Sequence, residues 1–208
     1  ILTGGGTTLM PQHPTWRVRL SADDRDLLAS LITKRPRQSM SWGLEDIRKS
    51  LEVFVADESK LPVKPTYRIS HLDDLMAVMG RGRFASGKES RVLFFDGRTH
   101  RKVGEVPTRF APHLMDFHPT QERWAYVRDD IGYIHKIDLY SMKVVRKVRA
   151  GLNGASLAVS RDGRFLAAGS YVPHTAVILD AATLEPLKLI ELRGVDPDGK
   201  TVEADSGM

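Results

Sequence analysis

The chain has 208 residues, of which 41% are hydrophobic, and carries a formal net charge of +5 with a pI of about 9.5. It contains no cysteine, which excludes disulfide bonds, a thiolate metal site and a thiol nucleophile within these residues. No run approaches the roughly 18 consecutive apolar residues of a membrane-spanning helix. The basic residues are dispersed rather than clustered, so binding to nucleic acid is not expected either.

The sequence of residues 1–70 predicts loops and two short helices. The opening stretch ILTGGGTTLMPQHPTWRVRL is rich in glycine and proline and is expected to be irregular. Ser21 is typical of an N-cap, and the acidic turn and leucine-rich face after it predict a helix of about 12 residues. After a linker at 34–41, WGLEDIRKSLEVFV predicts a second helix that runs into an extended segment. Residues 57–70 contain Pro62 and Pro65 and are expected to form a connection.

A repeat begins near His71. Asp96, Asp138 and Asp180 lie 42 residues apart without a gap, and each closes an apolar run: VLFFD, IHKID and VILD. A period of about 40–45 residues with four short strands is the spacing of a β-propeller blade. The three aspartates are therefore predicted to end equivalent strands in successive blades.

Apolar runs predict the individual strands of each repeat. The second repeat gives HLMDF, RWAYV, YIHKID and KVVRKV, and the third gives SLAVS, FLAAGSY, AVILD and PLKLIEL. Apolar residues fall on both faces of the middle strands, as in sheets packed between neighbours. His113 would lie at the start of an innermost strand, facing the channel of the propeller. Because the chain begins with Ile1 and holds fewer than the four to eight blades of a closed propeller, we expect a fragment of a longer protein.

Several stretches of the sequence resemble the cytochrome cd1 family. They are WGLEDIRKSL, FAPH at 110–113, VRDDIGYIHKIDLY at 127–140 and GSYVPHTAVILDAATLEPLK at 169–188. The resemblance implies a mainly β fold: a partial, originally eight-bladed β-propeller at residues 71–208, which would bind haem d1. It also implies a linker and short helix at 39–70, and the C-terminal end of a cytochrome c-like domain, a short helical remnant, at 1–38. The haem-attachment motif CxxCH is absent, so haem c would depend on residues outside this sequence.

The resemblance further implies roles for single residues. His113 of FAPH matches the family's proximal ligand to the haem d1 iron, a role that suits a neutral imidazole. The alternative for His113 is a half-exposed histidine on a strand. Arg128 of VRDD matches a family arginine and is expected, with Arg109 or Arg81, to bind the carboxylates of the macrocycle. The alternative for the arginines is a solvated surface charge.

Three other residues have weaker matches. Met10 is expected to be the second axial ligand of the haem c iron, and the alternative is a plain loop methionine. Tyr171 is expected to line the haem d1 channel, although tyrosines at such positions are more often part of a core. His118, which precedes Pro119, is expected to lie in a turn.

Two classes of function follow from the resemblance, and a third from the repeat alone. The first is a periplasmic oxidoreductase that passes electrons from haem c to haem d1 and reduces nitrite to nitric oxide. The second is a haem d1 assembly protein that oxidises or carries a haem d1 precursor, to which ERWAYVRDDIGYIHKIDLYSMKVVRKV is somewhat nearer. The third is a propeller without a cofactor that serves as an interaction platform. In the first two classes the full-length protein is expected to be an enzyme with an electron-donor protein as partner, and it could form a homodimer.

Overall fold

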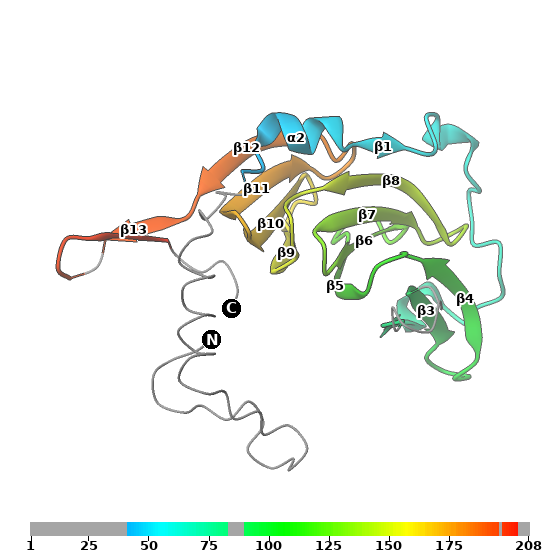
Figure 1. Cartoon of the computed structure of the whole chain (residues 1–208). Coiled ribbons are helices and arrows are strands. Elements are labelled where there is room, and N and C mark those ends of the chain that lie inside the picture. The colour runs from blue at the N-terminus through cyan, green and yellow to red at the C-terminus, as the bar shows by residue number, and fades with distance from the viewer. Residues whose placement is uncertain (1–40, 83–89, 196, 204–208) are drawn as a thin grey trace, which may run out of the picture. The chain divides into compact units, whose positions relative to one another are not determined.

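The computed structural model describes residues 41–82, 90–195 and 197–203 (Figure 1). The chain divides after Ser39, and all of the described residues belong to its second part. The predicted cytochrome remnant at 1–38, including Met10, lies outside the described residues. No helix in the described part is both long and apolar enough to cross a bilayer.

Three antiparallel sheets follow one another along the chain. The first contains β2 (Leu75–Gly80), β3 (Arg91–Asp96) and β4 (Lys102–Pro107). The second contains β5 (Pro112–Phe117), β6 (Trp124–Asp129), β7 (Tyr133–Asp138) and β8 (Lys143–Arg149). The third contains β9 (Ser156–Val159), β10 (Phe165–Tyr171), β11 (His174–Asp180) and β12 (Pro186–Glu191). The mainly β fold is therefore confirmed, and its successive sheets are consistent with part of a propeller.

The second sheet is buried on both faces because successive side chains of β6 point in opposite directions. Ala125 and Val127 pack against Val92 and Phe94 of the first sheet. Tyr126 instead joins a cluster that contains several apolar residues of the third sheet, among them Leu166 and Val177. Two separate cores thus hold the three sheets side by side.

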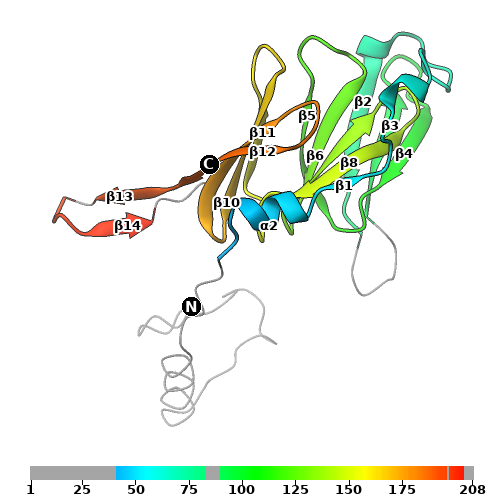
Figure 2. The ribbon, with the colours of Figure 1, turned by 90° about the horizontal axis from the view of Figure 1, so that it is seen from above.

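The segment before β2 runs across the outer strands of the second and third sheets (Figures 1 and 2). It contains α2 (Leu44–Lys49), β1 (Glu52–Val53) and two 3-10 turns, η2 (Glu58–Lys60) and η3 (Leu72–Asp74). The helix contacts β12 and β8, and β1 pairs with β8 as a fifth strand of the second sheet. The predicted short helix is therefore present. The extended segment predicted after it contains β1, which pairs with β8 of the second sheet.

A buried ion pair fixes this segment. The ammonium of Lys136 on β7 donates to both carboxylate oxygens of Glu58, at 2.9 and 3.0 Å, and to the carbonyl of Ala182, at 2.8 Å. Burial lowers the pKa of Lys136, whereas the Glu58 carboxylate raises it. One side chain of the second sheet thereby binds both the segment before β2 and the β11–β12 turn of the third sheet.

The chain after β12 forms a hairpin that the sequence did not predict. Its strands β13 (Arg193–Val195) and β14 (Thr201–Glu203) pair with each other and belong to none of the three sheets. Figures 1 and 2 both show it projecting from the third sheet.

Asp96, Asp138 and Asp180 end β3, β7 and β11, so the predicted equivalence of these strand ends is confirmed. Each carboxylate accepts hydrogen bonds from the turn that follows it. Asp138 accepts the backbone N–H groups of Tyr140 and Ser141 and the guanidinium of Arg123. The repeat therefore arises because each blade uses an aspartate to satisfy the donors of the same turn.

We expect Asp138→Ala to lower the free energy of unfolding by about 2–3 kcal/mol, because it leaves buried donors without an acceptor. Urea unfolding of the full-length protein, followed by tryptophan fluorescence, would measure the change. Hydrogen exchange should show faster exchange of the Tyr140 and Ser141 amides. Glu185→Ala removes an exposed carboxylate and serves as control; an equal effect of both variants would contradict the capping role.

Candidate functional site

His113 projects from a β-bulge at the start of β5. In the pairing of β5 with β6, Pro112 lies opposite Asp129 and Leu114 lies opposite Arg128, so His113 has no partner across the ladder. A bulge of this kind turns a side chain out of the regular alternation. The imidazole is 46% exposed, whereas its neighbour Pro112 is buried. The structure thus presents a single accessible histidine at the position that the sequence singled out.

Asp130 brings two of the predicted residues together. Its carboxylate forms an ion pair with the guanidinium of Arg81, which directly follows β2 of the first sheet. The other carboxylate oxygen lies 3.8 Å from Nδ1 of His113, which is close but longer than a hydrogen bond. Histidines that bind metals commonly direct their second ring nitrogen to a carboxylate. The arrangement therefore suits an imidazole that uses Nε2 as a ligand, with Nδ1 facing Asp130.

Tyr171 lies at the corresponding end of the third sheet. It ends β10, 42 residues after Asp129, which ends β6. Its ring is partly exposed, at 36% for the residue. The side-chain oxygen of Asn153 accepts the backbone N–H groups of Tyr171 and Val172, both at 3.0 Å. The tyrosine is thus held at the same end of the sheets as His113, without a recorded contact between the two side chains.

Arg128 occupies a different place from the one expected of a carboxylate ligand. Its residue is fully buried, and its guanidinium donates to the carbonyls of Ser156 and Asn153 and to the hydroxyl of Ser170, at 2.7–3.0 Å. Burial lowers the pKa of Arg128 to about 10, and the neighbouring Asp129 raises it. The sequence suggested either a ligand for the carboxylates of the macrocycle or a solvated surface charge, and a fully buried Arg128 side chain matches neither description. It connects the second and third sheets beneath the exposed residues.

Arg109 also lies apart from His113. It precedes β5 in the left-handed conformation, with φ of 63°, and its guanidinium lies 5.4 Å from the centre of the Phe110 ring. Arg109 lines a groove between the outer strands of the first and second sheets. Of the three arginines expected to bind carboxylates, only Arg81 is therefore placed beside His113.

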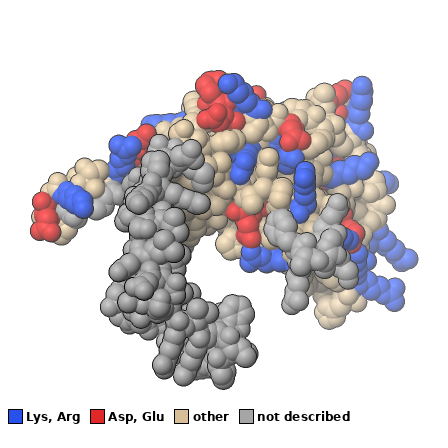
Figure 3. Space-filling model, viewed as in Figure 1, with Lys and Arg blue, Asp and Glu red and all other residues tan. Residues whose placement is uncertain are grey.

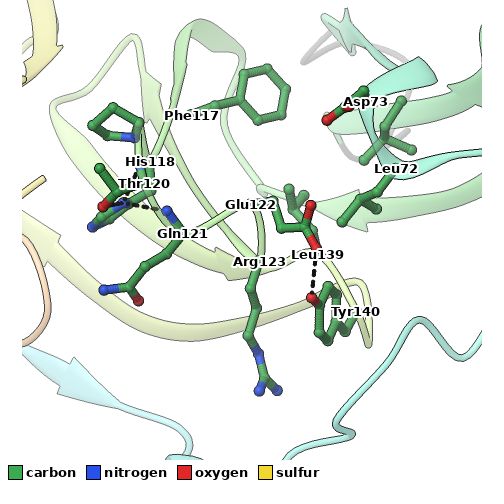
Figure 4. Close-up of a pocket in the computed structure, with 12 residues that line it drawn as sticks. Leu72, Asp73, Phe117, His118, Thr120, Gln121, Glu122, Arg123, Leu139 and Tyr140 are labelled. Atoms are coloured by element: carbon green, nitrogen blue, oxygen red, sulfur yellow. Dashed lines mark hydrogen bonds between the residues drawn. The ribbon is translucent and has the colours of Figure 1, made fainter.

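A cavity of about 780 Å³ lies between the β5–β6 turn and η3 (Figure 4). His118 lies at its edge, where Nδ1 accepts the N–H groups of Thr120 and Gln121, and burial lowers the pKa of the ring. The ring packs so closely on Gly163, where φ is +76°, that a Cβ there would lie 2.1 Å from the imidazole. His118 is thus a turn residue, as predicted, and supports the contact between two turns.

The described residues contain no group of three or more histidines, cysteines or carboxylates that could hold a metal ion by themselves. A lone imidazole binds iron well only when a macrocycle supplies the other ligands, as in haem proteins. An exposed imidazole backed by a carboxylate fits an axial haem ligand. Sequence reasoning missed Asp130, although the DD pair in the turn of VRDDIGY could have pointed to it.

Comparisons with known proteins agree with the fold and with the class of ligand. Residues 70–204 match the cytochrome D1 heme domain family, and the chain belongs to this family. It is 32% identical over 179 residues to a dihydro-heme d1 dehydrogenase of Pseudomonas aeruginosa, covering 86% of this chain and 35% of that protein. It is 27% identical over 187 residues to a nitrite reductase of Stutzerimonas stutzeri, covering 87% of this chain and 32% of that protein.

A solved structure supports the same relationship. The dihydro-heme d1 dehydrogenase NirN in complex with DHE superimposes with a TM-score of 0.68 at 32% identity, covering 89% of this chain and 38% of that chain. The chain therefore spans about a third of the length of the curated relatives it matches.

We expect Arg128→Met to lower the free energy of unfolding by about 2–4 kcal/mol, because two carbonyls and a hydroxyl lose their buried donor. Hydrogen exchange should become faster at residues 152–156 and 170–172. Arg161→Met, at an exposed turn, is the matched control. An Arg128→Met protein of unchanged stability that loses only its cofactor would instead support the carboxylate-binding role.

Proposed function

We propose that the full-length protein binds haem d1 or its dihydro precursor, with His113 as an axial ligand of the iron. The observation that carries this proposal is the exposed imidazole on the β5 bulge, with Nδ1 facing Asp130. Membership of the cytochrome D1 heme domain family supports the choice of ligand. Arg81 forms an ion pair with Asp130, and Tyr171 contributes to the rim of the same site.

Of the activities that the family includes, we propose oxidation of dihydro-haem d1. The sequence analysis had placed nitrite reduction first and haem d1 assembly second. The higher identity to the dehydrogenase, 32% against 27% for the nitrite reductase, and the TM-score of 0.68 to the dehydrogenase structure favour the second. A propeller without a cofactor is the least favoured class, since family membership argues for a haem-type ligand.

The proposed oxidation removes two electrons and two protons from the bound precursor, so it needs an electron acceptor. The macrocycle would supply the redox chemistry when bound. His113 would fix its position, and Asp130, paired with Arg81, would lie close to Nδ1 of the imidazole. We further propose that the sheets continue in the longer protein to a closed, eight-bladed propeller, located in the periplasm, with an electron-exchange protein as partner. Haem c with Met10 as a ligand, and a homodimer, remain predictions.

His113→Gly in the full-length protein should greatly weaken retention of haem d1, because it removes the imidazole that we propose as the iron ligand. Added imidazole should restore the visible spectrum of the bound haem, since it can enter the space that the side chain leaves. Unfolding by urea should be little affected, because His113 is half-exposed. His71→Ala, which changes another exposed histidine, should leave the spectrum unchanged. A normal haem d1 spectrum in His113→Gly would reject the ligand assignment.

The two activities can be separated with the purified full-length protein. If the dehydrogenase proposal is correct, dihydro-haem d1 incubated with the protein and an electron acceptor is converted to haem d1, as followed by its absorption spectrum. Nitrite with a reductant should then yield no nitric oxide above the background of free haem d1. Catalytic release of nitric oxide without conversion of the precursor would favour nitrite reductase instead.

A further inference from the structure

An open groove of about 690 Å³ separates the outer strands of the first and second sheets. It lies between the end of β4, at Val106 and Pro107, and the β8 strand, at Val144 and Lys147. Phe54, directly after β1, borders it on the side of the segment that crosses the sheets. None of the residues that we assign to haem binding lines this groove.

The charged side chains that line the groove are all basic. They are Arg109, Lys143 and Lys147. Lys147 pairs with Glu52 at 2.9 Å, but within the described ranges neither Arg109 nor Lys143 has a carboxylate partner, and both residues are exposed. Figure 3 shows several further Lys and Arg side chains over the first sheet, on the right of the view. Two unpaired cations beside one opening create a positive potential that favours an anionic partner.

Most of the remaining lining is apolar, and its two polar members, Thr108 and His135, are buried. Val106 and Val144 belong to the edge of the core between the first and second sheets, and Met142 packs beside them. Phe54 is 54% exposed, yet its backbone is held in place because its N–H donates to the carbonyl of Val145 at 2.9 Å. The ammonium of Lys147 lies 5.8 Å from the centre of the Phe54 ring. An exposed aromatic ring in a groove that also contains Arg109 and Lys143 suits a ligand that combines an apolar group with carboxylates.

The first sheet adds an edge to which an extended chain could pair. In the order β2–β3–β4 the outer side of β4 has no partner among the described residues, whereas the outer side of β8 is covered by β1. Val106 and Pro107 of β4 also line the groove. A peptide that lies along this edge would gain backbone hydrogen bonds in addition to its side-chain contacts. A small molecule would be poorly enclosed, because ligand pockets usually bury most of the ligand surface.

We propose that this groove is a docking site for an acidic, extended peptide segment of a partner protein. An apolar side chain of the segment packs against Phe54 and Val144, and flanking carboxylates pair with Arg109 and Lys143. Nucleic acid fits less well, because Phe54 is a single ring among aliphatic residues rather than part of a stacking platform. The proposal does not rest on the haem site, since it uses none of His113, Asp130 and Arg81. Arg109, which the sequence had suggested as a partner of the macrocycle, lines this groove instead.

The probe for the test is a fluorescein-labelled peptide of about ten residues, long enough to form a strand, with alternating Glu and Val and one central Phe. Binding to the full-length protein is measured by fluorescence anisotropy at low and at physiological salt. Saturable binding that weakens with salt is expected. A peptide with Lys in place of every Glu should not bind, and binding of both peptides alike would overturn the proposal.

Charge-reversal variants locate the site. Arg109→Glu combined with Lys143→Glu should weaken binding of the acidic peptide at least tenfold. Arg161→Glu combined with Lys188→Glu makes the same change of charge at exposed positions of the third sheet and should alter affinity less than threefold. Equal effects of the two pairs would mean non-specific attraction and would refute the site. If the first pair fails to fold, Arg109→Gln with Lys143→Gln replaces it, and unchanged affinity there counts equally against the site.

Phe54→Ser tests the apolar contact without changing charge, and a loss of at least fivefold in affinity is expected. A poly-anionic oligonucleotide that competes as well as the peptide, with no effect of Phe54→Ser, would assign the groove to nucleic acid and reject the peptide. Hydrogen exchange of the full-length protein supplies a last criterion. If the amides of β4 that do not pair with β3 are already protected before peptide is added, and remain unchanged after it, another part of the polypeptide covers the groove and the proposal fails.

Discussion

The buried guanidinium of Arg128 holds in place the end of the sheets that carries the candidate site. It reaches from β6 to the carbonyls of Asn153 and Ser156, at the start of the third sheet, and to the hydroxyl of Ser170. Asn153 in turn holds the backbone of Tyr171. Both terminal nitrogens of the guanidinium have acceptors, whereas its buried Nε has none among the described residues. Burying a charge is costly unless it is hydrogen-bonded, so the three contacts favour one geometry for the loop between the sheets. Tyr171 therefore lies above a buried set of polar groups, those of Arg128, Asn153 and Ser170, that hydrogen-bond mainly to one another and to the backbone.

The strands could be predicted from the sequence because their periodicity has a direct physical origin. Both faces of β6 are buried, so it begins with four successive apolar residues, and both β6 and β7 end at an aspartate that accepts hydrogen bonds from the following turn. Asp96, Asp138 and Asp180 mark this end regardless of what the loops contain. The short helix before the sheets was predicted from the apolar pattern of WGLEDIRKSLEVFV, and the structure places the acidic residues Glu45 and Asp46 in its first turn.

The features that the sequence did not predict have a different origin, because most of them depend on contacts with residues that are distant in sequence. β1 has only two residues, and it becomes a strand because the edge of β8 is available. The hairpin of β13 and β14 has no apolar face to reveal it. Arg128 and Arg81 have the same side chain, but the first is enclosed by the third sheet and the second remains exposed. Asp130 could have been noticed as part of a DD pair, but not that it would face His113.

The ion pair of Arg81 with Asp130 connects the first and second sheets at the candidate site, but it contributes little to the stability of their contact. Both side chains are substantially exposed, and pairs of this kind contribute less than about 1 kcal/mol. The two sheets are positioned instead by the apolar cluster that contains Val92, Phe94 and Val127. The charges around His113 can therefore rearrange toward a bound macrocycle at little cost in stability. The apolar cluster therefore fixes the positions of the two sheets, whereas the exposed side chains of Arg81 and Asp130 can change conformation when a ligand binds.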